Sequence, residues 1–166
     1  MTLLINSKNQ KKESLQPKGF LRYFSFSLDH KVIGIQYLVC GFIFYLVGGS
    51  LASAIRVELA SPMSDFMPRD VYNQVLTLHG TIMIFLWIVP VVNGAFGNYL
   101  IPFYVGARDM AFPRLNAVAF WLIPPSGLML ITSYFVDGAA QAGWTAYPPL
   151  SITTPQSGQI IWILSV

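Results

Sequence analysis

The sequence predicts an all-α transmembrane helical bundle with three complete spans and the start of a fourth. Hydrophobic residues make up 54% of the chain and charged residues only 10%, whereas soluble domains carry roughly 25% charged residues. Residues 32–55, 71–107 and 115–136 contain no Lys, Arg, Asp or Glu. Since about 20 apolar residues cross the hydrocarbon core of a bilayer as a helix, each stretch is long enough to span it.

Residues 1–27 form a polar and basic amino-terminal tail. Most of the ten Lys and Arg residues lie in this region or just after it: Lys8, Lys11, Lys12, Lys18, Arg22 and Lys31. A basic flank before the first span favours a cytoplasmic amino terminus by the positive-inside rule. Nucleic-acid binding is the less favoured interpretation of this charge, and we expect no nucleic-acid partner. The apolar run after Lys31 is too long for the core of a signal peptide, so we expect the first span to stay in the membrane.

The membrane domain is predicted to cover residues 28–166, with spans at about 32–55, 73–104 and 115–136. The second span contains Pro90, which predicts a kink. The third contains Pro124 and Pro125, which are tolerated where neighbouring helices satisfy the freed carbonyls. The first span carries small residues that let a neighbouring helix or a ligand come close: Gly34, Gly41, Gly48, Gly49, Ser50 and Ala52.

Three polar segments connect and follow the spans. Residues 56–70 and 106–114 are short charged loops, and a cytoplasmic amino terminus places loop 106–114 on the cytoplasmic side. Residues 137–159 are rich in Gly, Pro, Ser and Thr and predict a long loop, with Trp144 and Tyr147 at the membrane interface. A new apolar helix starts at 159–166 and is too short to cross a bilayer. We therefore expect this chain to be a fragment, or a truncated reading frame, of a larger bundle.

His79 is the one group within residues 71–107 that titrates near neutral pH. An imidazole inside a membrane span is costly unless something binds it, so His79 is a candidate functional residue. Gly80 follows it and leaves room for a large planar group near the backbone. Spacing alone leaves two interpretations open, an interhelical hydrogen bond and an axial haem ligand. Helical periodicity places four residues on its face: Tyr72, Val75, Met83 and Leu86.

Five motifs carry a resemblance to a known family. They are DHKVIG at 29–34, IRVEL at 55–59, YNQVLTLHGTIMIF at 72–85, GAFGNYLIPFYVGARDMAFPRLN at 94–116 and GWTAYPPLS at 143–151. Together, in this order, they resemble the amino-terminal third of subunit I of haem–copper oxidases, in the bacterial style of the cytochrome c oxidase branch. The resemblance implies that the larger bundle has about twelve spans, each a helix because lipid leaves no other partner for the backbone.

The resemblance implies a haem site at one end of the bundle. It makes His79 an axial ligand of the low-spin haem, which is haem A in this branch, and so the ligand of its iron. Arg56 corresponds to the arginine that hydrogen-bonds the haem formyl group, and Tyr72 to a tyrosine near the same haem. Glu58 corresponds to a carboxylate of a peripheral cation site. From the residues alone, Arg56 is better interpreted as an anchor to lipid headgroups and Glu58 as a solvated loop charge.

The resemblance also implies the first part of a proton pathway. Asp109 corresponds to the acid at the mouth of the inner proton-uptake pathway, and Asn98 and Asn116 to amides that order water along it. The residues alone allow Asp109 simply to pair with Arg108 or Arg114. Two positions depart from the family pattern, since Arg108 and Ala117 stand where many relatives have Pro and Asn.

The implied function is that of the catalytic subunit of a proton-pumping terminal oxidase. Electrons would pass from cytochrome c, or a similar soluble carrier, through subunit II to haem A. They would continue to a high-spin haem and copper centre that reduces dioxygen to water. The implied partners are subunits II and III and membrane lipid. The implied location is a bacterial-type cell membrane or an internal respiratory membrane.

The chain has only two histidines, so the ligands of the high-spin haem and copper are expected outside it. His30, at the inner surface, is not expected to be one of them, and residues 1–166 alone should be inactive as an oxidase. One alternative is a non-catalytic remnant, or a protein that holds haem or assists assembly. A cytochrome b-type carrier is disfavoured because spans 32–55 and 115–136 contain no histidine to pair with His79.

Overall fold

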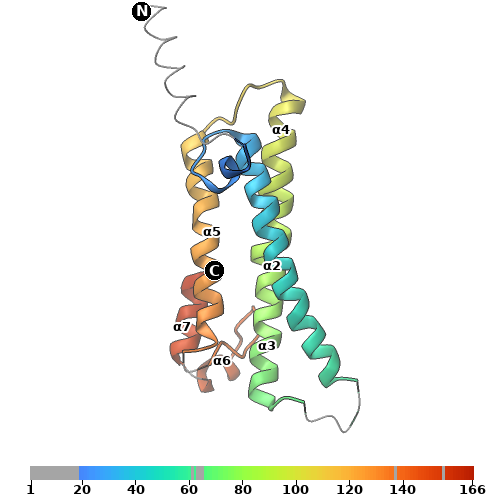
Figure 1. Cartoon of the computed structure of the whole chain (residues 1–166). Helices are drawn as coiled ribbons and strands as arrows, with labels where there is room; N and C mark the ends of the chain where they lie inside the picture. The colour runs from blue at the N-terminus through green and yellow to red at the C-terminus, as the bar shows by residue number, and fades with distance from the viewer. Residues whose placement is uncertain (1–18, 61, 63–65, 137, 155) are drawn as a thin grey trace, which may run out of the picture.

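The computed structural model describes residues 19–60, 62, 66–136, 138–154 and 156–166, and its architecture is three long helical rods side by side (Figure 1). The all-α prediction is confirmed, because three rods are long and apolar enough to cross a membrane: His30–Glu58, Arg69–Val105 and Pro113–Ser133. The predicted tail, 1–27, is described only from Gly19 on. The elements are η1 (Gly19–Phe24), α2 (His30–Glu58), α3 (Arg69–Thr81), η2 (Ile82–Ile88), η3 (Pro90–Phe96), α4 (Gly97–Val105), α5 (Pro113–Ser133), α6 (Leu150–Thr153) and α7 (Gln156–Ser165).

The first rod is α2, and a side-chain cap fixes where it begins. Asp29 is its N-cap, and Asp29 Oδ1 accepts a hydrogen bond from the Lys31 amide at 2.9 Å. An aspartate at this position satisfies one of the free amides at the start of a helix. The 3₁₀ helix η1 lies beside this first part of α2, where Gln36 Nε2 donates to the carbonyls of Tyr23 and Ser25. The amino-terminal approach is thereby attached to the rod.

The second rod runs without interruption from α3 through η2 and η3 to α4. Sequence analysis predicted a kink at Pro90, and the structure has two wide π-type segments around this position, η2 and η3, which are separated by Val89. Proline has no amide hydrogen and its ring crowds the carbonyl four residues earlier, and a wider turn relieves both problems. The rod ends at Gly106, whose left-handed backbone (φ 71°) suits glycine.

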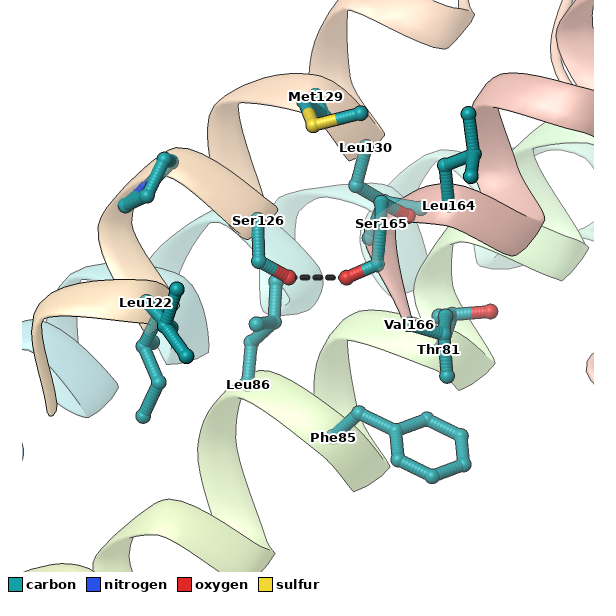
Figure 2. A pocket seen from close by; sticks show the side chains of 12 residues that line it. Thr81, Phe85, Leu86, Leu122, Ser126, Met129, Leu130, Leu164, Ser165 and Val166 are labelled. Atoms are coloured by element: carbon teal, nitrogen blue, oxygen red, sulfur yellow. Dashed lines mark hydrogen bonds between the residues drawn. The ribbon is translucent and has the colours of Figure 1, made fainter. Parts of the chain in front are cut away.

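The third rod is α5, and α7 packs against it (Figure 1). Pro113 stands at the first position of α5, where a missing amide hydrogen costs nothing. The predicted loop 137–159 contains the short α6, and α7 begins at Gln156, a little before the predicted 159. Ser126 Oγ of α5 donates to the Ser165 carbonyl of α7 beside a cavity of about 450 Å³ that the second rod also lines (Figure 2).

Two buried apolar clusters hold the rods together. We call the end of the bundle with His30 and Val105 the His30 end, and the end with Glu58 and Arg69 the Glu58 end. One cluster includes Phe44, Leu78, Ile82, Leu86, Leu130 and Trp162. The other lies nearer the His30 end and consists of Ile33, Tyr37, Ala95, Ala117 and Phe120.

The outward faces of the rods remain apolar. Phe42, Ile43 and Leu46 on α2 are each more than half exposed, as are Leu122 and Leu128 on α5. A monomer in water rarely exposes so much contiguous apolar surface, whereas lipid-facing helices do so by necessity.

Candidate functional site

His79 lies near the Glu58 end, where α3 faces α2. Its Nδ1 is 2.9 Å from the backbone carbonyl oxygen of Gly48. A carbonyl can only accept, so Nδ1 carries the hydrogen and donates it. The other ring nitrogen, Nε2, is then the one with a free lone pair, which is the arrangement that metal-ligating histidines commonly show. The interhelical hydrogen bond and the ligand role, which the sequence left as alternatives, are therefore compatible in one side chain.

The backbone beside His79 leaves room for a planar group. A Cβ built on Gly80 would meet only Trp144 Cδ1, at 4.0 Å. Trp144 also packs edge-on against Phe85, with ring centroids 6.1 Å apart. Trp144, which was predicted to lie at the membrane interface, is half-exposed. Its contacts with Gly80 and Phe85 place it close to the first turns after His79. Among the described residues, no three His, Cys, Asp or Glu side chains come together as a metal-binding group.

The three other residues predicted at this end lie at the facing ends of α2 and α3. Arg56 is in the last turn of α2 and exposed, and Tyr72 is in the first turn of α3 and half-buried. Glu58 Oε2 accepts a hydrogen bond from the Met67 amide at 3.0 Å, so this carboxylate orders the start of α3. Residues 61 and 63–65 of the connecting loop fall outside the described residues.

At the His30 end, Asp109 contacts a residue that sequence analysis had not considered for it. His30 Nδ1 lies 3.1 Å from Asp109 Oδ1, and the His30 side chain is 7% exposed against 42% for Asp109. The residues alone had allowed Arg108 or Arg114 as the partner, and within the described residues the side-chain partner of Asp109 is His30. Asp109 Oδ1 also accepts from the Met110 amide at 2.8 Å.

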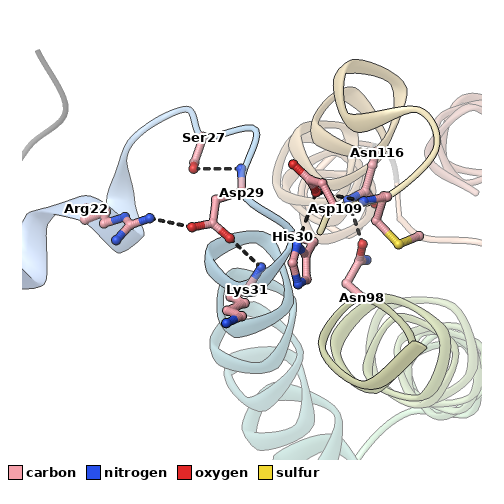
Figure 3. A network of polar contacts seen from close by, with 9 residues as sticks. Arg22, Ser27, Asp29, His30, Lys31, Asn98, Asp109 and Asn116 are labelled. Atoms are coloured by element: carbon pink, nitrogen blue, oxygen red, sulfur yellow. Dashed lines mark hydrogen bonds and ion pairs between the residues drawn. The ribbon is translucent and has the colours of Figure 1, made fainter. Parts of the chain in front are cut away.

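Asn98 and Asn116 are joined by a hydrogen bond next to this pair (Figure 3). Asn116 Nδ2 donates to Asn98 Oδ1 at 2.6 Å, and Asn98 Nδ2 donates to the Gly94 carbonyl at 2.7 Å. Asn98 is only 4% exposed, so this chain of amides leads from the surface at Asp109 into the bundle. Buried amides are kept in proteins where their hydrogen bonds are satisfied, as here.

The comparison with known protein families concerns most of this chain. The family model described as "Cytochrome C and Quinol oxidase polypeptide I" matches residues 32–166. The chain belongs to this oxidase subunit I family. It is 65% identical over 144 residues to cytochrome c oxidase subunit 1 of Synechocystis sp., covering 87% of this chain and 26% of that protein. It is 63% identical over 144 residues to the Thermostichus vulcanus subunit, with the same two coverages.

A more distant relative is the heme-copper oxidase subunit I+III of Aeropyrum pernix, 44% identical over 155 residues, which are 90% of this chain and 19% of that protein. The chain spans about a quarter of the length of the first two relatives. Membership in the subunit I family and three membrane-length apolar rods make it an integral membrane protein.

Sequence analysis of this subunit I family member missed one residue of the polar cluster at the His30 end. His30 was interpreted only as a surface histidine in the DHK motif. A usable signal was present, because a charged motif immediately before span one and the charged loop after span two must meet at the same membrane face when the two spans are antiparallel. The residue that bonds His79, Gly48, acts through its backbone carbonyl, and side-chain chemistry gave no means of selecting it.

Proposed function

We propose that this chain supplies two working parts of the catalytic subunit of a proton-pumping terminal oxidase. The first is a ligand of the low-spin haem at His79, with Arg56 and Tyr72 near its edge. The second is a proton-uptake site at the cytoplasmic surface, formed by Asp109 with His30 and continued inward by Asn98 and Asn116. The complete oxidase would take electrons from cytochrome c or a similar carrier through subunit II and reduce dioxygen to water.

The observation that carries the proposal is the pair of polar sites at opposite ends of one rod. His79 and Asn98 are both in the second rod, and the difference in residue number is 19. An α-helical rise of 1.5 Å per residue gives at most about 28 Å, because the π-type turns between them hold more residues for their length. That separation is close to the thickness of the hydrocarbon core. A haem ligand near one surface and a proton-uptake group at the other are what a redox-driven pump requires.

The donor chemistry of His79 fits a haem. Gly48 fixes the Nδ1 tautomer and the direction of the ring, so Nε2 is presented as the ligand atom without a further rearrangement. The small residue at Gly80 leaves the adjacent space open. Haem A would supply one-electron transfer. Arg56 would act on its formyl group as a hydrogen-bond donor, which would adjust the reduction potential. Residues outside this chain would supply the second axial ligand and would bind the high-spin haem and the copper.

The role of the His30 end is to take up protons and to order the water that carries them. Asp109 is 42% exposed in its side chain, so it can exchange protons with water, while His30 is buried against it and holds one carboxylate oxygen. Asn98 and Asn116, which lie further into the bundle, would order water. Their side chains are already oriented, because Asn98 donates to the Gly94 carbonyl and Asn116 donates to Asn98. Asp109 would bind and release the proton, and the two amides would order the water that carries it inward.

The test uses the full-length oxidase. His79→Ala should remove the low-spin haem band from the optical spectrum and abolish turnover. His30→Ala is the matched control, because it removes the chain's other histidine and should leave the band intact while slowing proton uptake. A low-spin band that survives His79→Ala would contradict the haem assignment. If both variants left the haem spectrum and proton uptake as in the parent, neither His79 nor His30 would belong to a working site of the oxidase.

A further inference from the structure

A groove between η1, α2 and α5 takes no part in the two sites above. Its volume is about 500 Å³, within the range of pockets that hold small molecules. Phe24 of η1, Val39 and Ile43 of α2, and Trp121 of α5 line it. Val39 is 43% and Ile43 55% exposed, so the groove opens on the outer face of the three described rods.

One buried amide gives the groove a polar atom. Gln36 also lines it and is 4% exposed. Gln36 Nε2 donates to the Tyr23 carbonyl at 3.0 Å and to the Ser25 carbonyl at 2.9 Å. Two carbonyl partners identify this atom as the nitrogen, so Oε1 is the remaining acceptor. In the part of the chain that the structure describes, Gln36 Oε1 has no donor. An unsatisfied buried acceptor is costly and favours a ligand that brings a hydrogen-bond donor.

The depth of the groove restricts what such a ligand can be. At 1.5 Å per residue, Gln36 lies about 9 Å and Ile43 about 20 Å along α2 from its start at His30. This interval is inside the hydrocarbon region if α2 spans the membrane. The described residues that line the groove include no charged side chain. A charged headgroup placed there would lose its water without an ionic partner.

We propose that the groove binds a neutral membrane lipid with a free hydroxyl group, such as a long-chain alcohol or a diacylglycerol. Its hydroxyl donates to Gln36 Oε1, and about 10 Å of its hydrocarbon lies along α2 towards Ile43. The acyl esters of an ordinary phospholipid offer only acceptors at this level, so they cannot satisfy the amide oxygen. The inference rests on Gln36 and the groove and does not depend on the haem or proton sites.

Photolabelling of the full-length oxidase tests the proposal. The probe is hexadecanol with a diazirine in its chain, and labelled peptides are identified by mass spectrometry. Labelling is expected on the peptides that contain Cys40 and Trp121, which both line the groove. Unlabelled hexadecanol should compete, and its methyl ether should compete about fivefold less well, the effect of losing one hydrogen bond. Ile43→Trp should fill the groove and suppress labelling without touching Gln36.

The control is Ile88→Trp, a change of the same kind at a 52% exposed position on the second rod, and it should leave the labelling unchanged. A Gln36→Leu variant should lose the preference for the alcohol over the ether. It also removes the hydrogen bonds that attach η1 to α2, so the Ile43→Trp variant is the decisive one. Labelling no stronger at Trp121 than at Ile88 overturns the proposal. Equal competition by alcohol and ether, or stronger competition by an anionic phospholipid, also overturns it, since the hydroxyl would then have no role.

Discussion

The contact between His30 and Asp109 predicts that these two residues act as one unit in proton uptake. The perturbation is a double-mutant cycle in the full-length oxidase, with His30→Gln, Asp109→Asn and the two combined. Both replacements keep a polar side chain of similar size and remove a titratable group, so they separate proton transfer from folding. Haem content should be unchanged in all three variants, because both residues lie at the end of the bundle remote from His79.

The size of the coupling follows from the geometry. His30 Nδ1 and Asp109 Oδ1 are 3.1 Å apart. The His30 side chain is buried, and the Asp109 side chain is 42% exposed. A hydrogen bond within a protein contributes about 0.5–1.5 kcal/mol net. The partial exposure of Asp109 keeps this contact within that range, so we expect a coupling of about 1 kcal/mol. That corresponds to about a fivefold effect on the rate constant of proton uptake.

The assay is the rate of proton uptake in a single turnover, followed with a pH-sensitive dye. His30→Gln should slow uptake about fivefold by the coupling above, and Asp109→Asn should slow it more and stop pumping. In the Asp109→Asn background, His30→Gln should have no further effect. Arg108→Gln is the control, since it removes a charge next to Asp109 that takes no part in the contact with His30, and it should behave like the parent. Independent, multiplicative losses in the double variant would refute the coupling.

Two further predictions concern single residues. Arg56→Met should shift the absorption of the low-spin haem and its formyl stretch in resonance Raman while haem stays bound; an unchanged formyl band would return Arg56 to the role of a headgroup anchor. Asn116→Ala should leave the buried Asn98 Oδ1 without its donor, lowering the free energy of unfolding by about 1–3 kcal/mol. Denaturant unfolding in detergent measures this, and an unchanged stability would mean that water replaces the amide.

The sequence predicted the three rods well because charge is excluded from lipid, and that exclusion is visible in the composition of each stretch. The resemblance grouped Asp109, Asn98 and Asn116 as parts of one proton pathway, which stays a prediction, and the structure places these three side chains near His30 (Figure 3). Sequence analysis did not identify the contact of Asp109 with His30, which are 79 positions apart. Such a contact depends on how two rods align, and local periodicity carries no information about that alignment.

The small residues of the first span illustrate the same limit. Sequence analysis grouped six of them as sites of close approach. Only some have the second rod against them: a Cβ at Gly41 would lie 2.6 Å from Val91 Cγ2, and one at Gly48 would lie 2.7 Å from Met83 Sδ. Gly49 has nothing within 4 Å. The face that a helix turns towards its partner is set by packing, so a list of small residues predicts that close approach occurs but leaves its position open.

The two wide segments of the second rod solve a problem of register between the rods. On α2 the contact positions Gly34, Gly41 and Gly48 recur every seven residues, as two turns of an α-helix require. On the second rod each of these glycines meets two residues, and one from each pair forms a series that recurs every eight: Met83 (with Ile82), Val91 (with Trp87) and Tyr99 (with Ala95, which is nearer to Gly34). Sixteen residues of regular α-helix would make about 4.4 turns where the matching part of α2 makes about 3.9, an excess of roughly half a turn.

The segments η2 and η3 take up this excess, because a π-type turn contains more residues than an α-turn. A one-residue deletion between η2 and η3 should therefore be tolerated, whereas a one-residue insertion there should not. Deletion of Val89, which lies between the two segments and is 45% exposed, removes one surplus residue. One segment can then become α-helical, with His79 and Asn98 still on their present faces. Insertion of an alanine after Val89 adds a residue that no segment can absorb and turns the Asn98 end by about 100°.

The full-length deletion variant should therefore keep both its low-spin haem band and its proton uptake. The insertion variant should keep the band, since His79 precedes the change, and lose uptake because Asn98 no longer meets Asn116. If the insertion were as well tolerated as the deletion, the wide segments would have no part in aligning the two sites. If the deletion alone abolished proton uptake, each wide turn would be needed in its present form. The match of eight residues on the second rod to seven on α2 would then be set by more than the glycine contacts.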